Sequence, residues 1–477
     1  MKKIRILSVL SVLIICASLF SPALAAEGTD SSPETAAASA MGAILPSYTV
    51  KAESALLLEL NTGLVLLEQN ADEQIYPASL TKIMTCMLTL ENGNLSDQIM
   101  VSETALSGLD PAGSTAGLQV GEVLSLEELL YCMMLSSANE ACNVAAEYVS
   151  GSVDAFVELM NQRAAELGCT GTHFANPHGL HSENHYTTAR DLSIIAQEAL
   201  KSETFRTITS TVAHEVPATN LSEPRDLVTT NDLINPSSRY YYDKASGVKT
   251  GYTTPAGRCL ISTADNGKLK LLSVICKAQD VPLENGDMEA QSFTETKAMF
   301  EYGFEHVAYA KVLTTLNPIA QIPVLMSAGA GEAVLAPDSE ITALLPVDYD
   351  ETLIVQDVQL ISQEGVEAPV SKGQILGKVT VSYDGRTLGT SNLVAITDIP
   401  RSEIAAHTAS TKSFFAENWW KVLLGILVLL IILYIVVVSI NRSRRRKRRQ
   451  QQRERRRQQA DVIEFPNGRR YHDRDED

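Results

Sequence analysis

Residues 77–85 read Pro-Ala-Ser-Leu-Thr-Lys-Ile-Met-Thr, and within this stretch Ser79 and Lys82 stand three positions apart. A proline before the apolar run 83–90 favours a helix that begins here. Residues three apart share one face of a helix. A lysine on that face can take the serine proton, so the pair can form a nucleophile without a histidine. Alone, the pair is a weak signal, since a serine here is often only a helix cap.

Two further motifs follow in order, Ser137-Ala138-Asn139 and Lys249-Thr250-Gly251. We predict that Ser137 relays a proton between Lys82 and the leaving amine, and that Asn139 holds a backbone amide of the substrate. Each tripeptide alone is typical of an ordinary helix end or strand end. The three motifs together, in this order, are a strong signal of acyl transfer through a serine.

The third motif lies on a predicted strand, whose edge can pair with an extended peptide. We predict that Lys249 and Thr250 bind a carboxylate, with Lys249 charged and facing the substrate. Gly251 would let the substrate backbone approach closely. The amides of Ser79 and Tyr252 would form an oxyanion hole.

Lys82 has a different task, because a general base must be neutral when it accepts a proton. Burial lowers the pKa of a lysine, and so does a second cation close by. We therefore predict that Lys82 is buried on its helix near Lys249.

Both ends of the chain indicate export and membrane attachment. Lys2, Lys3 and Arg5, an apolar run and Ala23-Leu24-Ala25 are typical of a cleaved secretory signal, with an uncleaved anchor as the alternative. Residues 422–438 are apolar and uncharged, and the run reaches on to Ile440, so at about 1.5 Å per residue it is long enough to span a membrane core of about 30 Å. Trp419 and Trp420 precede this run, and the basic run Arg442 to Arg449 follows it, which predicts a cytoplasmic C-terminus.

The charge distribution agrees with this division. The whole chain has a formal net charge of −18 although the tail 442–477 is strongly basic, so the exported region is strongly acidic. We therefore expect no nucleic-acid partner. Six cysteines follow the signal, without metal-type or redox-type Cys-x-x-Cys spacing. We expect mostly buried free thiols.

The pattern of the mature chain predicts an α+β fold, an antiparallel sheet flanked by helices, followed by a small all-β region. Helical spacing recurs in 123–135, 153–167 and 189–200, whereas short β runs dominate from 307 to 399. The expected organisation in chain order is a signal peptide (1–25), a flexible linker (26–46), a serine peptidase domain (47–305), a small all-β domain that acts as a spacer (306–400), a linker (401–418), a transmembrane helix (419–440) and a basic cytoplasmic tail (441–477).

These motifs resemble the serine D-alanyl-D-alanine carboxypeptidases, the low-molecular-weight penicillin-binding proteins. The resemblance covers roughly 47–400 and includes Asn176-Pro177-His178-Gly179-Leu180, Ala189-Arg190-Asp191-Leu192 and Tyr302-Gly303-Phe304. It implies a β-lactamase-like catalytic fold and removal of the terminal D-alanine from peptidoglycan pentapeptide stems through a Ser79 acyl-enzyme. It also implies covalent inhibition by β-lactam antibiotics. We expect no cofactor and no metal ion.

The chain departs from the family pattern in three places. Tyr252 stands where many members have histidine, although its backbone amide can still serve. No arginine occurs between Arg258 and Arg386, where many members carry one near the substrate carboxylate. The C-terminal anchor has the composition of a transmembrane helix, whereas the usual anchor of the family is an amphipathic helix.

Three other functions compete with this interpretation. A β-lactamase would need a glutamate placed to activate water, and no Glu-x-x-Leu-Asn pattern occurs. A metallopeptidase is suggested by His173, His178, His181 and His185, but no carboxylate pattern completes a site. A non-catalytic cell-wall sensor would not need an intact set of serine and lysines.

Overall fold

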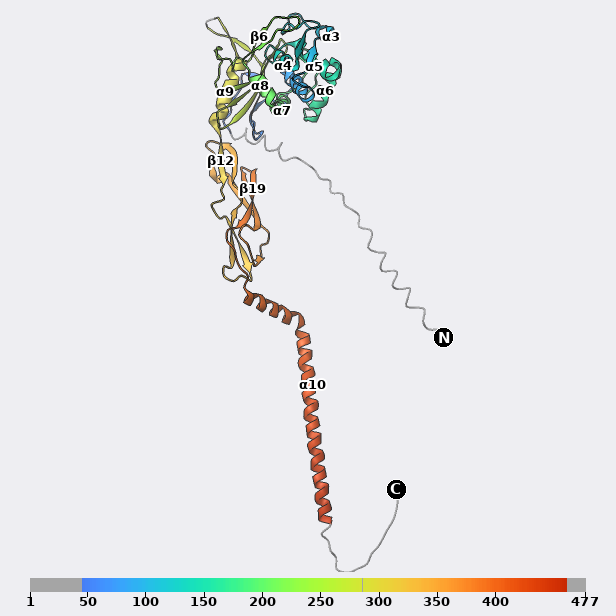
Figure 1. Ribbon diagram of the computed structural model, residues 1–477. Coiled ribbons are helices and arrows are strands. Elements are labelled where there is room, and N and C mark those ends of the chain that lie inside the picture. The colour runs from blue at the N-terminus through green and yellow to red at the C-terminus, as the bar shows by residue number, and fades with distance from the viewer. Residues whose placement is uncertain (1–44, 285, 461–477) are drawn as a thin grey trace, which may run out of the picture. The chain divides into compact units, whose positions relative to one another are not determined.

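The computed structural model describes residues 45–284 and 286–460 (Figure 1). The predicted signal peptide, most of the predicted first linker and the end of the predicted tail lie outside these residues. The chain divides into two compact units. The first holds the described residues up to Leu313 together with Ile341–Gln356 and Thr380–Gly389, and the second holds the remainder.

The first unit is built around a five-stranded antiparallel sheet in the order β2-β1-β9-β8-β7. Its strands are β1 (Ala52–Glu59), β2 (Val65–Gln69), β7 (Ala245–Thr253), β8 (Gly257–Asp265) and β9 (Lys270–Ala278). Strand β7 is therefore an edge strand, as the third motif requires if it is to pair with a peptide.

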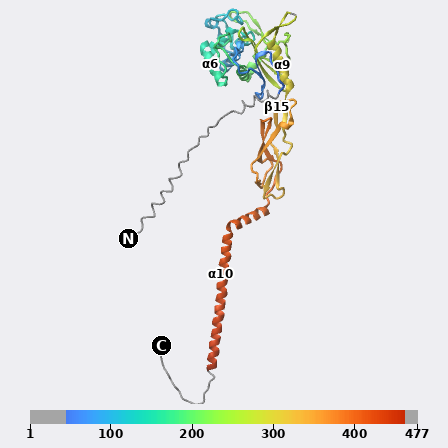
Figure 2. The same cartoon turned by 180° about the vertical axis from the view of Figure 1, so that it is seen from behind.

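Both faces of the sheet pack against helices, which explains the long apolar runs in its central strands β1, β8 and β9. Successive side chains of a strand point to opposite faces. In β1, Leu56 and Leu58 join the core beneath the helices of the first motif, whereas Ala55 and Leu57 join the core formed with Phe300 of α9 (Gln291–His306). Helix α6 (Val153–Glu166) and its neighbours lie on the opposite side of the sheet from α9 in both views (Figures 1 and 2).

The helices between β2 and β7 begin where polar caps permit. Ser125, Ser152 and Thr188 each accept a backbone N–H at the start of α4, α6 and α7. The cap at Ser125 starts α4 at Leu126, three residues later than the predicted start, and Val123–Ser125 forms strand β4. The elements in this segment are η1 (Ala78–Thr81), α2 (Lys82–Asn92), β3 (Gln98–Met100), α3 (Glu103–Leu106), β4, α4 (Leu126–Met134), α5 (Asn139–Ser150), α6 (Val153–Glu166), α7 (Ala189–Ala199), α8 (Glu203–Ser210), β5 (Ala213–Val216) and β6 (Arg225–Val228).

The remaining strands confirm the predicted small β region. In the first unit, β12 (Val307–Leu313) pairs with β15 (Ile341–Pro346). In the second unit, β14 (Glu332–Pro337) pairs with β13 (Ala320–Leu325) and with the end of β19 (Arg386–Ala395), whose first residues belong to the first unit. The other elements are β10 (Asp280–Pro282), β11 (Met288–Ala290), η2 (Glu351–Leu353), β16 (Ile354–Leu360), β17 (Val366–Glu367) and β18 (Ile375–Tyr383). An α+β domain with an added β region is therefore confirmed.

The second unit ends in the long helix α10 (Glu403–Ala460). It contains a span that is long and apolar enough to cross a membrane, and none of that span is buried. The predicted linker 401–418 is helical from Glu403 onward and continuous with this span. The six described cysteines are buried free thiols, as predicted.

Candidate active site

Ser79 and Lys82 meet as the first motif predicts. Ser79 lies in the 3-10 turn η1, which leads directly into α2 at Lys82. The Nζ atom of Lys82 donates a hydrogen bond to Ser79 Oγ over 2.9 Å. Lys82 is completely buried. The contact joins the two groups between which a proton would pass during activation of the serine.

Two further acceptors hold the Lys82 ammonium in place. Its Nζ donates to Asn139 Oδ1 over 2.9 Å and to the backbone carbonyl of His178 over 2.6 Å. Together with Ser79 these acceptors use all three donors of an ammonium group. Burial lowers the pKa of Lys82, although the nearby Glu140 carboxylate opposes this shift. The site thus orients Lys82. It also makes the neutral form of Lys82 easier to reach than the neutral form of an exposed lysine.

The second motif lies where α4 gives way to α5. Asn139 is the first residue of α5, and Ser137 precedes it with a left-handed backbone of φ +60°. Ser137 Oγ is buried and has no hydrogen-bond partner among the described residues. A buried hydroxyl without a partner is rare in folded proteins. The hydroxyl is therefore available to a substrate.

The third motif brings β7 against the nucleophile. A Cβ atom on Gly251 would lie 3.1 Å from Ser79 N and 3.2 Å from Pro77 O, so a larger residue would press on the turn that carries Ser79. The neighbouring Thr250 hydroxyl shares a 2.6 Å hydrogen bond with the Thr230 hydroxyl. Gly251 thus lets the strand lie close beside the turn that carries Ser79, which would have to shift slightly to admit a larger residue.

Lys249 lies differently from our expectation of a charged side chain that faces the substrate. The side chain is only 1% exposed, and Nζ donates to the Thr250 carbonyl over 3.2 Å. Burial, and then the charge of Lys82, lowers the pKa of Lys249 to about 7. The physical reason is strand alternation: Lys249 shares the inward face with Gly251 and points into the protein.

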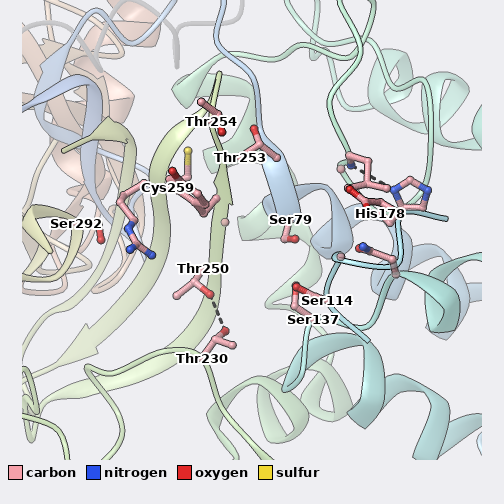
Figure 3. A pocket seen from close by; sticks show the side chains of 18 of the residues that line it. Ser79, Ser114, Ser137, His178, Thr230, Thr250, Thr253, Thr254, Cys259 and Ser292 are labelled. Atoms are coloured by element: carbon pink, nitrogen blue, oxygen red, sulfur yellow. Dashed lines mark hydrogen bonds between the residues drawn. The ribbon is translucent and has the colours of Figure 1, made fainter. Parts of the chain in front are cut away.

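The three motifs surround one cavity of about 600 Å³ (Figure 3). Figure 3 shows Ser79 between the strand that carries Thr250 and the loop that carries Ser137. Lys82 and Lys249 do not line the cavity. Its lining includes Ser79, Asp110, Gly113, Ser114, Ser137, Asn139, His178, Gly179, Thr230, Asp232, Thr250, Gly251, Tyr252, Arg258 and Ser292.

The loop at 176–180 is a part of the site to which the sequence assigned no role. Its His178 carbonyl holds Lys82, and its Gly179 packs on the turn that precedes the nucleophile. A Cβ atom on Gly179 would lie 1.9 Å from the Ala78 carbonyl oxygen, and the backbone has φ +89°. The glycine was visible in the sequence, but its partner lies about a hundred residues away.

We expect Gly179→Ala to slow labelling by fluorescent penicillin at least about tenfold, because the added methyl group must displace the turn that carries Ser79. Gly168→Ala is the matched control. Gly168 also has a positive φ of +78°, but nothing lies within 4 Å of its added Cβ. It should pay only the backbone strain, about 1–2 kcal/mol, and keep its labelling rate. Equal labelling rates in the two folded variants would contradict this account.

The four clustered histidines that suggested a metallopeptidase make contacts with protein groups and do not form a metal site with the described residues. His178 and His185 are buried, and burial lowers the pKa of each to about 3. His185 Nε2 lies 2.8 Å from the Thr81 hydroxyl, and His173 Nδ1 lies 2.6 Å from the Asn184 carbonyl. Among the described residues, no three His, Cys, Asp or Glu side chains are grouped so that they could hold a metal ion.

Comparison with known proteins agrees with this geometry. Residues 37–280 match the D-alanyl-D-alanine carboxypeptidase family called Peptidase S11, and residues 317–401 match the C-terminal domain of penicillin-binding protein 5. The chain is 33% identical over 358 residues to D-alanyl-D-alanine carboxypeptidase DacF of Bacillus subtilis, covering 74% of this chain and 87% of that protein. It is 27% identical to DacA of Escherichia coli, covering 78% and 89%.

A solved structure shows the same relationship. Penicillin-binding protein 5 of Haemophilus influenzae aligns with a TM-score of 0.54 and 26% identity, covering 75% of this chain and all of that one. The family match covers half of the chain, and the three motifs meet at one cavity. The chain therefore belongs to the D-alanyl-D-alanine carboxypeptidase family, and it carries the C-terminal domain of penicillin-binding protein 5.

Proposed function

We propose that this protein is a serine-type D-alanyl-D-alanine carboxypeptidase, which removes the terminal D-alanine from peptidoglycan pentapeptide stems and is acylated by β-lactams. The observation that carries the proposal is the 2.9 Å contact between Lys82 Nζ and Ser79 Oγ at the cavity. The family to which the chain belongs supports the same chemistry.

In the proposed reaction, Ser79 Oγ attacks the carbonyl carbon of the penultimate D-alanine while neutral Lys82 accepts its proton. The amides of Ser79 and Tyr252 stabilise the resulting oxyanion. The C–N bond then breaks, and Ser137 passes the proton from Lys82 to the departing amine. Water hydrolyses the acyl-enzyme in a second step and regenerates Ser79.

The remaining motif residues would hold the substrate. Asn139 uses its Oδ1 on Lys82, which leaves its amide nitrogen for a backbone carbonyl of the stem peptide. Thr250 and Gly251 line the cavity on the edge strand and would align the peptide there. We propose that buried Lys249 acts on the substrate through its charge and not through contact.

The direct test is release of D-alanine from a tripeptide that ends in D-Ala-D-Ala, using the purified full chain in detergent. We expect D-alanine release and slow turnover of penicillin. Rapid penicillin turnover without D-alanine release would favour the β-lactamase alternative, although no glutamate lines the cavity. Absence of both activities and of penicillin labelling would favour the non-catalytic sensor.

Acylation by penicillin should become faster as the pH rises, along a limb centred below the pH at which an exposed lysine loses its proton. Lys82 must be neutral to accept a proton, and raising the pH removes its proton. Burial lowers the pKa of Lys82, so Lys82 loses its proton at a lower pH than an exposed lysine does. An exposed lysine would do so at about 10.4. The measurement is the acylation rate constant from pH 5 to 10, with circular dichroism as the control for folding. A limb centred near 10 would contradict the prediction.

We further propose that α10 crosses the cytoplasmic membrane once, with the catalytic domain outside and the C-terminus inside. The apolar span of α10 and the basic run at 442–449 support this orientation. Protease added to intact protoplasts should digest the catalytic domain and leave a C-terminal epitope tag protected. Loss of the tag in intact protoplasts would overturn this topology. We likewise propose a peptidase domain at 47–305, a small β domain at 306–400 and a transmembrane helix at 419–440.

A further inference from the structure

The proposed substrate ends in a carboxylate, and neither Lys82 nor Lys249 can contact that group directly. Both lysines are buried and do not line the cavity. Two acidic residues of the lining, Asp110 and Asp232, would repel a carboxylate. Among the described residues that line the cavity, Arg258 alone carries a lysine-type or arginine-type positive charge.

The fold places Arg258 next to the segment that would bind the peptide end. Arg258 lies near the start of β8 and is the cross-strand partner of Tyr252, which follows Gly251 on the edge strand. Directly opposed side chains on neighbouring strands lie within reach of one another. Accordingly, the Arg258 guanidinium carbon lies 4.8 Å from the centre of the Tyr252 ring.

Asp280 fixes the orientation of this guanidinium group. Arg258 Nη2 donates to Asp280 Oδ2 over 2.8 Å, and Nε lies 3.1 Å from both carboxylate oxygens. A guanidinium group carries five donors in a planar fork. The ion pair occupies the Nε edge, so Nη1 and the second Nη2 hydrogen face away from Asp280. The Arg258 side chain is 43% exposed, which leaves that edge accessible.

We infer that Arg258 binds the carboxylate of the terminal D-alanine, with Thr250 as its neighbour on the edge strand and Asp280 as its positioning residue. The inference rests on the proposed carboxypeptidase function and assigns the specificity-determining cation. Paired donation from a guanidinium fork to a carboxylate is stronger than a neutral hydrogen bond and has a defined direction. It would explain how this chain manages without an arginine between Arg258 and Arg386.

The test compares two substrates, a tripeptide ending in D-Ala-D-Ala and its C-terminal amide. The wild-type protein should prefer the free carboxylate. Arg258→Ala should lower kcat/KM for the carboxylate substrate about tenfold to a hundredfold and change the amide less than about threefold. Arg258→Lys should restore part of the preference, because it returns the charge without the planar fork.

Arg239→Ala is the matched control. Arg239 also stacks on a tyrosine, at 4.9 Å from the Tyr240 ring, and pairs with Asp287, but it does not line the cavity. This control should keep the carboxylate preference. The inference is overturned if Arg258→Ala keeps that preference, or if it loses activity on both substrates equally. A wild-type protein that releases no D-alanine would overturn the proposed function as well, so the two failures are distinguishable.

Discussion

Ser79→Ala is expected to abolish covalent labelling by penicillin and to lower D-alanine release by at least about 10⁴-fold. Among the described residues that Lys82 Nζ contacts, Ser79 alone offers an atom that can form the acyl bond, since the other two contacts are an amide oxygen and a backbone carbonyl. The substitution removes one hydroxyl and should leave the fold unchanged. Thermal unfolding of the wild-type and variant proteins, followed by gel labelling and a D-alanine assay, measures both parts of this expectation.

Ser292→Ala is a suitable control for the loss of a serine in the same cavity. Ser292 lines the cavity, and Figure 3 shows it apart from Ser79, beyond the strand that carries Thr250. We expect this variant to keep its labelling. If Ser79→Ala were labelled like the wild-type protein, another nucleophile would carry the reaction.

Lys82→Met should lower the acylation rate by about 10²–10⁴-fold, the usual contribution of a general base. The loss should appear at saturating penicillin, because the proton is transferred in the chemical step and not in binding. Removal of Nζ also leaves Asn139 Oδ1 and the His178 carbonyl without their buried donor. Each unpaired acceptor costs about 1–3 kcal/mol, so the melting temperature should fall too.

Lys82→Arg separates these two effects. Arginine keeps donors for the buried acceptors but stays protonated, so it cannot act as a base. We expect this variant to be as slow as Lys82→Met while unfolding at a higher temperature. A folded Lys82→Arg protein that acylates at the wild-type rate would show that Lys82 acts only by position.

Local patterns predicted most of the fold. The apolar spacing of 153–167 and 189–200 became α6 and α7, and the capping serines and threonine set where the helices begin. Strand β14 lies within the predicted β region 307–399, but the pattern did not set its bounds, because the segment Glu332–Pro337 mixes small residues with proline and lacks a clear alternation.

The site was less predictable, because its decisive contacts join distant segments. The spacing of Ser79 and Lys82 predicted their contact, since both lie on one helical turn. Whether Lys249 would be exposed depended on which face of β7 packs inward, and the motif does not contain that information. The role of His178 rests on a backbone carbonyl, which any residue could supply. Arg258 became a candidate only through its cross-strand pairing with Tyr252.

The most direct test of the serine acyl-enzyme is the mass of the protein after incubation with benzylpenicillin. We expect the full chain to gain the mass of one penicillin. After proteolysis, the adduct should lie on the peptide that contains Ser79. An unchanged mass, or an adduct on a peptide that contains Ser137 or another residue instead, would contradict the proposed mechanism.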